Sequence, residues 1–272
     1  MNDAGSFARL VGALRPWLAQ RVVVGGWAHR LHRLHELAGS PSYAPLLTRD
    51  ADVAFSENTR FTGDIREALR AARFQEEFFG DHMPPVTHYR LGAEAGGFYA
   101  EFLVPLRGGG VRRDGSIDAT LKKAGITAQK LRHLELLLVR PWIIRLPPWG
   151  DVPLDPPAEV MIANPVSFIA QKLLIRPGRS PEKQAQDTLY IHDTLDLFGQ
   201  RLDSLRELWH GSIRPELPPR TLRAVTDSAS AHFSAVDGVI IGAARMAADR
   251  TLQADRVQKL CAYGLAEIFG PG

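Results

Sequence analysis

A cluster of prolines divides this 272-residue chain into two parts with different sequence patterns. Upstream of the cluster, short apolar runs alternate with stretches rich in Gly and Pro, which is typical of a mixed α/β domain. Downstream of it, apolar residues recur at helical spacing, beginning at Pro165, a residue that the first turn of a helix accepts. The cluster consists of Pro147, Pro148, Pro153, Pro156 and Pro157. We therefore expect an α/β domain over residues 1–155 and a helical C-terminal domain over residues 156–272.

The composition narrows the class of protein. Hydrophobic residues make up 45% of the chain and charged residues 23%, which is ordinary for a globular protein. No apolar run approaches the roughly 18 residues of a membrane span, and the first residues lack the basic start and apolar stretch of a secretory signal. The single cysteine, Cys261, excludes an internal disulfide and argues against a cysteine-built zinc site. These features predict a cytoplasmic protein with no membrane partner.

The first apolar run, residues 22–24, ends at Gly25 and Gly26 and is followed by helical spacing over residues 27–38. The run predicts a short buried strand, and Trp27, Leu31 and Leu34 would share the buried side of the helix. Glycine lets a ligand approach the backbone closely, and backbone N–H groups ahead of a helix favour an anion. The two glycines are therefore candidates for contact with a phosphate group.

A second strand is predicted over residues 50–55, and it begins with the acidic pair Asp50 and Asp52. Residues two apart in a strand point to the same face, so the two carboxylates project together. Carboxylates so close repel one another. A divalent cation relieves that repulsion, and Mg²⁺ typically uses one or two carboxylates together with substrate phosphates. The pair therefore predicts a metal and nucleotide site.

A third carboxylate, Glu101, lies within an apolar strand predicted over residues 98–106, which follows another predicted strand over residues 86–91. Its position favours a role as metal ligand or as general base toward an attacking hydroxyl. A structural residue held in a salt bridge is the alternative interpretation. The remaining patterns predict a helix over residues 61–75, a strand over 134–146, and helices over 166–176, 181–198, 202–210, 219–235 and 250–269.

Three histidines, His29, His32 and His35, recur along the helix predicted over residues 27–38. On a helix their directions fan over about 120° and do not converge as zinc ligands must. We therefore expect solvated histidines rather than a zinc site.

Three segments together resemble the nucleotidyltransferase superfamily, which shares its fold with DNA polymerase β. They are residues 22–28, residues 48–53, and residues 165–173 followed by Arg179, Lys183 and Asp187. Within the superfamily the chain looks most like the AbiEii and MenT toxins of type IV toxin–antitoxin systems, over about residues 20–195. It departs from their usual pattern at Leu46 and Leu47, where an Arg is common, and at Glu101, where Asp is commoner.

The resemblance implies a mixed-sheet nucleotidyltransferase domain of α+β type, followed by a helical domain that closes over the nucleotide. It implies transfer of a nucleoside monophosphate from an NTP such as ATP, with Mg²⁺ or Mn²⁺, to a hydroxyl of RNA, tRNA foremost, or of a protein. A cognate antitoxin is an implied partner. Asp50, Asp52 and Glu101 would be the catalytic and metal-binding residues. The nucleotide-binding residues would be Gly25, Gly26, Thr48, Lys172, Lys183 and Asp187.

Two other functions remain open from the residues alone. One is a non-catalytic member of the fold that binds a nucleotide or a partner, and the other is an enzyme that modifies a small molecule such as an aminoglycoside. The formal net charge of +3 permits a phosphate-rich partner without requiring one, because affinity for nucleic acid depends on clustered cations.

Overall fold

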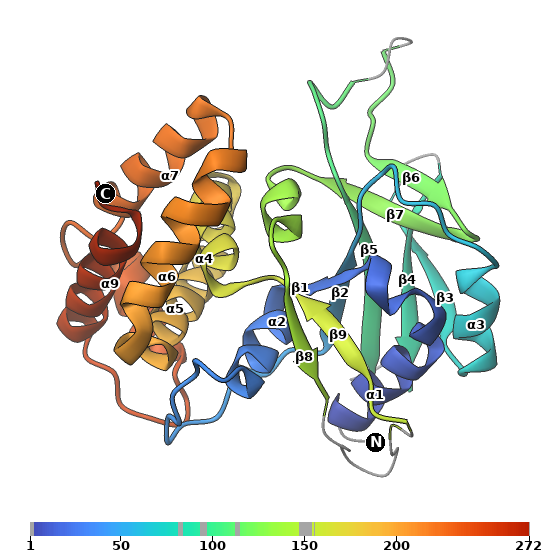
Figure 1. Ribbon diagram of the computed structural model, residues 1–272, viewed down its shortest axis with the longest axis horizontal. Helices are drawn as coiled ribbons and strands as arrows, with labels where there is room; N and C mark the ends of the chain where they lie inside the picture. The colour runs from blue at the N-terminus through green and yellow to red at the C-terminus, as the bar shows by residue number, and fades with distance from the viewer. Residues whose placement is uncertain are drawn as a thin grey trace. The chain divides into compact units, whose positions relative to one another are not determined.

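A computed structural model describes residues 3–80, 84–92, 97–111, 115–146, 154 and 156–271 (Figure 1). The chain forms two compact units. The first comprises Met1–Leu34 and Leu47–Ala163, and the second comprises His35–Leu46 and Asn164–Gly272. Among the described residues, no helix is both long and apolar enough to cross a membrane.

The first unit contains a mixed sheet with the strand order β3-β4-β5-β2-β1-β9-β8, and a β6–β7 hairpin joins it through β5. The pairs β2–β5, β1–β9 and β5–β7 are parallel, and the others are antiparallel. The strands are β1 Val22–Val24, β2 Asp50–Ala54, β3 Gln75–Phe79, β4 Val86–Leu91, β5 Phe98–Pro105, β6 Thr120–Lys123, β7 Ile126–Leu131, β8 Trp142–Arg145 and β9 Glu159–Ile162. The helices are α1 Asp3–Ala13, η1 Arg15–Gln20, α2 Gly25–Leu31, η2 His32–Leu34, α3 Ile65–Ala71 and η3 Leu134–Leu138.

The two faces of this sheet differ in character. Side chains of one face, such as Val53, Tyr89 and Phe102, are almost fully buried. Helix α1 packs on this face, since its Phe7 and Val11 border the same small cavity as Val53. The opposite face carries polar side chains on its central strands and is only partly covered. Because α1 packs on the apolar face, the polar face is available for functional groups.

The second unit is helical, and local signals explain where several of its helices begin. The side chain of Asn164 accepts a hydrogen bond from the Ser167 N–H at 2.8 Å, and Asp237 does the same for Ile240 at 2.8 Å. Such caps satisfy N–H groups that the first turn leaves without a partner. The helices are α4 Pro165–Ile175, η4 Arg176–Gly178, α5 Pro181–Leu197, η5 Gly199–Arg201, α6 Leu202–Leu208, a π turn Trp209–Ile213, η7 Arg214–Glu216, α7 Pro219–Ala231, α8 Gly238–Met246 and α9 Ala254–Phe269.

The segment His35–Leu46 belongs to the second unit although its neighbours in sequence belong to the first. The Gly39 N–H donates to the Leu197 carbonyl at 2.8 Å. The Tyr43 hydroxyl donates to Asp196 Oδ2 at 2.8 Å, and the Arg250 guanidinium lies 3.6 Å from the centre of the Tyr43 ring. At the other boundary, β9 lies beyond residue 155 but pairs with β1 and β8, so the first unit extends to Ala163.

Several predicted elements have different bounds in the structure. The helix predicted over residues 61–75 is confined to α3 Ile65–Ala71, because Asp64 caps its start and Gln75 already begins β3. The strand predicted over residues 134–146 is divided into η3 and β8. The helix predicted over residues 27–38 ends as an α-helix at Leu31. Leu34, expected on its buried side, is 41% exposed because the tighter η2 turn rotates it away from that side.

The prediction of solvated histidines was wrong for two of the three. His29 and His32 are buried, and His32 Nε2 lies 2.8 Å from the Ala163 carbonyl oxygen. The helical turn that carries them is enclosed by the core, since Trp27 stacks on Phe7 with ring centres 4.0 Å apart. The ring of His32 also packs edge-on against Trp142 of β8. These long-range contacts explain the burial, which helical spacing alone did not indicate.

Candidate active site

The turn between β1 and α2 places Gly25 and Gly26 directly against two residues of the next strand segment. Gly25 has a φ of +62°, a left-handed conformation that favours glycine. A Cβ atom at Gly25 would overlap Asp52 Oδ2, and one at Gly26 would lie 2.7 Å from Thr48 Cβ. Thr48 in turn donates through Oγ1 to the Asp50 carbonyl at 3.3 Å. Both glycines are therefore required by the close approach of Asp52 and Thr48.

The three carboxylates predicted from the sequence lie on one face of the sheet. Asp52 pairs in register with Glu101 across the parallel β2–β5 ladder, and Asp50 pairs with Tyr99. Partners in register on adjacent strands project to the same face, and so do residues two apart on one strand. Asp50 is exposed, whereas Asp52 and Glu101 are half-buried. The sheet therefore brings the three acidic residues to one surface, which we call the acidic face.

Glu101 has an altered titration in this setting. Burial raises the pKa of its carboxyl group above the ordinary value, and the negative charge of Asp50 raises it further, while His88 acts in the opposite direction. The effect of Asp50 shows that the two carboxylates repel each other. Within the described segments, no three His, Cys, Asp or Glu side chains converge closely enough to hold a metal ion.

His88, which no sequence motif indicated, is the direct neighbour of Glu101. It stands opposite Glu101 in the antiparallel β4–β5 ladder, and its Nε2 lies 3.1 Å from Glu101 Oε1. The ring of Phe79 packs on the His88 ring with centres 4.3 Å apart. The only signal for His88 was its place in the strand predicted over residues 86–91. Its contact with Glu101 depends on the register between two strands, which the sequence did not show.

In the second unit, Lys172 and Asp187 form a buried ion pair between α4 and α5. Lys172 Nζ lies 2.7 Å from Asp187 Oδ1, and Arg179 Nε lies 2.8 Å from Asp187 Oδ2. The Asp187 side chain is only 2% exposed. Lys172 Nζ also lies 5.2 Å from the centre of the Tyr190 ring and 5.4 Å from that of Phe168, within the range of a cation–π contact. Asp187 therefore pairs with two basic side chains, and we call these three residues the ion cluster.

Lys183, the other predicted nucleotide residue of this region, lies outside the ion cluster. It is exposed on the first turn of α5, and its ammonium group donates to Gln186 Oε1 at 3.2 Å. The structure thus brings Lys172 and Asp187 together, adds Arg179, and leaves Lys183 at the surface.

Comparison with known proteins assigns the family. A family model described as Nucleotidyltransferase matches residues 2–213. This chain belongs to that nucleotidyltransferase family. No curated protein and no solved structure matches the chain. The match confirms the general nucleotidyltransferase prediction.

The matched segment contains every predicted site residue of this nucleotidyltransferase. It spans all the strands of the sheet as well as α4, α5 and α6 of the helical unit, and it ends in the π turn before α7. The helices α7, α8 and α9 lie beyond it. The family assignment therefore applies to the acidic face and to the Lys172–Asp187 pair, and leaves the last helices of the second unit without an assigned role.

The acidic face has the chemical groups that nucleotidyl transfer requires. It offers carboxylates of two kinds: exposed Asp50, which can reach a bound cation, and half-buried Glu101, whose raised pKa suits proton acceptance. The Gly25 turn brings its backbone against the Asp52 carboxylate. Carboxylate oxygens, a proton acceptor and a glycine turn thus lie on the same sheet.

Proposed function

We propose that this nucleotidyltransferase transfers a nucleoside monophosphate from an NTP to an acceptor hydroxyl in a reaction that depends on a divalent cation. The observation that carries the proposal is the in-register pairing of Asp52 with Glu101, beside Asp50 and against the Gly25 turn. In this reaction the acceptor oxygen forms a bond to the α-phosphorus. The bond from that phosphorus to the bridging oxygen breaks, pyrophosphate leaves, and a base takes the hydroxyl proton.

The donor set fits Mg²⁺ or Mn²⁺. Mg²⁺ is commonly bound by one or two carboxylates together with substrate phosphates rather than by an all-protein cage. Asp50 and Asp52 would supply the two carboxylates, with Glu101 as a third ligand once phosphate is present. When bound, the cation would offset the negative charge of the triphosphate and of the attacking oxygen.

Glu101 is our candidate for the proton acceptor, and a metal ligand is its alternative role. Burial raises its pKa, which makes its carboxylate more basic than an exposed one. His88, at 3.1 Å, would orient the carboxylate through one oxygen and leave the other for the acceptor hydroxyl. The same contact supports the alternative that Glu101 is a structural salt-bridge residue, and a Glu101→Gln variant separates the two.

The nucleotide would be held by groups of three kinds. The backbone of Gly25 and Gly26 would contact phosphate oxygens, and the Thr48 hydroxyl lies beside them. Lys172 would neutralise phosphate charge, with Asp187 fixing the position of its ammonium group. Lys183, exposed and without a carboxylate partner among the described residues, would add a weaker attraction, and we expect Lys183→Ala to change nucleotide affinity only a few-fold.

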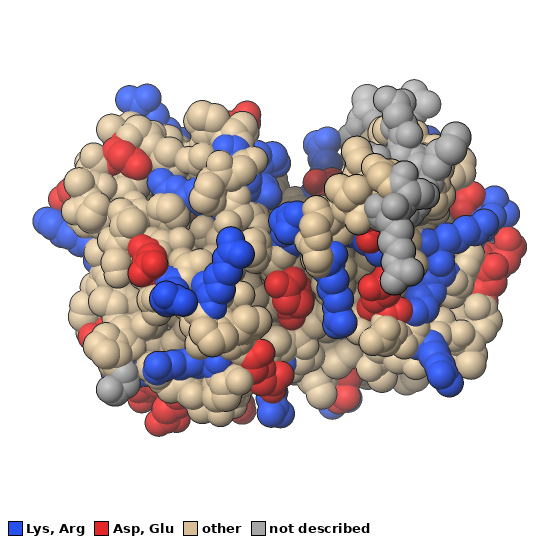
Figure 2. Space-filling view, turned by 90° about the horizontal axis from the view of Figure 1, so that it is seen from above, with Lys and Arg blue, Asp and Glu red and all other residues tan. Residues whose placement is uncertain are grey.

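The acceptor and the partners are proposed from the resemblance to AbiEii and MenT toxins. RNA, tRNA foremost, or a protein would receive the nucleotide, and an antitoxin would bind the enzyme. The distribution of charged side chains does not favour one of these acceptors over the other. On the face shown in Figure 2, basic side chains lie among acidic ones instead of forming one continuous patch.

A transfer assay tests this proposal directly. The protein would be incubated with each NTP labelled at the α-phosphate, with Mg²⁺ or Mn²⁺, and separately with tRNA, total RNA, a protein extract and an aminoglycoside. Asp52→Asn serves as the inactive control. Label on RNA or protein supports the proposal, and label on the aminoglycoside supports the small-molecule alternative. Nucleotide binding with no turnover on any acceptor would make the chain a non-catalytic member of the family.

A further inference from the structure

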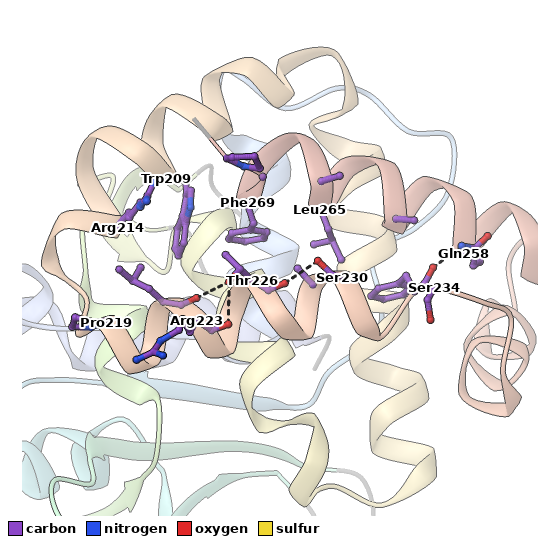
Figure 3. Close-up of a pocket in the computed structure, with 17 residues that line it drawn as sticks. Trp209, Arg214, Pro219, Arg223, Thr226, Ser230, Ser234, Gln258, Leu265 and Phe269 are labelled. Atoms are coloured by element: carbon purple, nitrogen blue, oxygen red, sulfur yellow. Dashed lines mark hydrogen bonds between the residues drawn. The ribbon is translucent and has the colours of Figure 1, made fainter.

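A crevice of about 840 Å³ lies between α7 and α9 in the helical unit (Figure 3). Apart from Trp209, all the residues that line it lie after residue 213, where the family match ends. Almost all of the crevice therefore belongs to the part of the chain that the family match does not cover. Its volume lies within the range of small-molecule sites.

The deep walls of the crevice are aromatic and aliphatic. Trp209 and Phe269 pack edge to face with ring centres 4.8 Å apart, and Leu265 lies beside them. These three side chains line the crevice although they are only 1%, 4% and 1% exposed, respectively. The crevice is therefore an apolar slot between two helices, and such a slot suits an extended alkyl chain.

The hydroxyl groups along the crevice, and one N–H of the Gln258 amide, already donate to backbone carbonyls. Thr226 donates to the Leu222 and Arg223 carbonyls at 3.2 and 3.0 Å, and Ser230 donates to Thr226 at 3.1 Å. Ser234 donates to the Ala231 carbonyl at 3.0 Å, and the Gln258 amide donates to that of Phe233. With these protons committed, the length of the crevice offers a ligand mainly methyl and methylene surface.

One end of the crevice is positively charged. Arg214 and Arg223 stand there with Pro219, while Ser234 and Gln258 mark the other end (Figure 3). Neither arginine forms an ion pair with a carboxylate in the described part of the chain, and Arg214 Nη1 lies 3.1 Å from His210 Nδ1. The first turn of α7 lies at the same end and has no side-chain cap, which adds the positive end of a helix dipole. Burial, together with the charges of Arg214 and Arg206, lowers the pKa of nearby His210.

We propose that this crevice binds a free single-chain amphiphile with an anionic head, of the fatty-acid type. The alkyl chain would occupy the slot between α7 and α9, and the carboxylate would meet Arg214 and Arg223. The proposal is independent of nucleotidyl transfer. It follows from three properties of the crevice: its apolar walls, hydroxyl donors that are already satisfied, and two guanidinium groups at one end that pair with no carboxylate among the described residues.

Calorimetric titration with octanoate, decanoate and dodecanoate, each below its micelle concentration, tests whether the slot binds an alkyl chain. A buried methylene contributes about 0.8 kcal/mol, so affinity should rise about fourfold with each added methylene. Dodecanol, which has no charge, should bind more weakly than dodecanoate. An affinity that does not depend on chain length would overturn the proposal. So would binding that is seen only with anionic phospholipid vesicles, because that result would indicate a membrane surface as the ligand.

Matched variants locate the ligand. Ser230→Phe and Ala266→Phe should fill the slot from α7 and α9, respectively, and reduce dodecanoate affinity at least tenfold. Ala231→Phe is the control, since Ala231 is equally exposed on α7 but does not line the crevice. Arg223→Gln should weaken dodecanoate binding roughly threefold to tenfold and leave dodecanol unaffected. Arg220→Gln, on the same helix but outside the lining, should change neither. Equal effects of the lining and control variants would overturn the proposal.

Discussion

The acidic face of the first unit and the ion cluster of the second unit place charge in opposite ways. On β2 and β5, carboxylates of like charge are gathered, and Asp50 raises the pKa of Glu101. Between α4 and α5, Asp187 pairs with Lys172 and Arg179 at 2.7 and 2.8 Å. The first arrangement carries a repulsion that a bound cation would remove, whereas in the second one carboxylate is paired with two cations. The comparison therefore separates the proposed cation site from a cluster whose carboxylate is already paired.

We expect the largest effect on activity from a substitution that removes one carboxylate of the acidic face. We expect Asp52→Asn to reduce nucleotidyl transfer by at least about a thousandfold, because it removes a proposed metal ligand. Folding should be unharmed, and thermal stability in the absence of divalent cations should be equal or higher, because one repelling charge is lost. Transfer kinetics and thermal unfolding in EDTA are the measurements. Wild-type turnover by a folded Asp52→Asn protein would remove Asp52 from the site.

Substitutions in the ion cluster should act mainly on the free energy of unfolding. Asp187→Ala leaves Lys172 and Arg179 without their shared carboxylate, and loss of one member of a buried pair costs about 3–5 kcal/mol. Lys172→Met should cost less, about 1–2 kcal/mol, since Arg179 still pairs with Asp187. Urea unfolding measures both.

The same two variants also sharpen the role of Lys172 in nucleotide use. If Lys172 and Asp187 serve one nucleotide, their effects on kcat/KM for the NTP should be non-additive in the double variant. Unchanged kinetics in folded Lys172→Met would make the pair purely structural.

A smaller effect is expected at the turn that adjoins Asp52. Gly25→Ala would place a Cβ atom on Asp52 Oδ2 and would also have to adopt a φ of +62°. Gly63→Ala is the matched control, because Gly63 has a φ of +81° but its Cβ would make only an ordinary contact, 3.5 Å from the Trp17 ring. Both variants should lose about 1–2 kcal/mol from the left-handed backbone, measured by urea unfolding. Only Gly25→Ala should also lose transfer activity.

The smallest effect concerns the pH dependence of stability. The pKa of Glu101 is raised in the folded protein, so the folded state binds its proton more tightly than the unfolded state does. Stability should therefore fall as the pH rises from the ordinary carboxyl value of 4.5 through the raised folded value. Glu101→Gln should flatten this part of the curve of melting temperature against pH, measured without divalent cations. An unchanged slope would show that Glu101 does not titrate in this way.

Local patterns predicted the elements that carry the site. The strand predicted over residues 86–91 is β4 itself, and the helix predicted from Pro181 begins at Pro181. Alternation along β2 was enough to place Asp50 and Asp52 on one face, because that geometry belongs to a single strand. By contrast, β3, β6, β7, β9 and α8 were not predicted. Strand β9 is short, and its pairing with β1 and β8 explains why it forms a strand.

The sequence by itself determined the order of strand, glycine turn, helix and acidic strand, since spacing, turns and caps are local properties. Only the tertiary structure decided that Glu101 stands beside Asp52 and touches His88, because the register between strands is set by contacts between residues far apart in the chain. It also decided that His29 and His32 are buried and that residues 35–46 join the helical unit. Burial and pairing depend on which distant surfaces meet, and no short window of sequence contains that information.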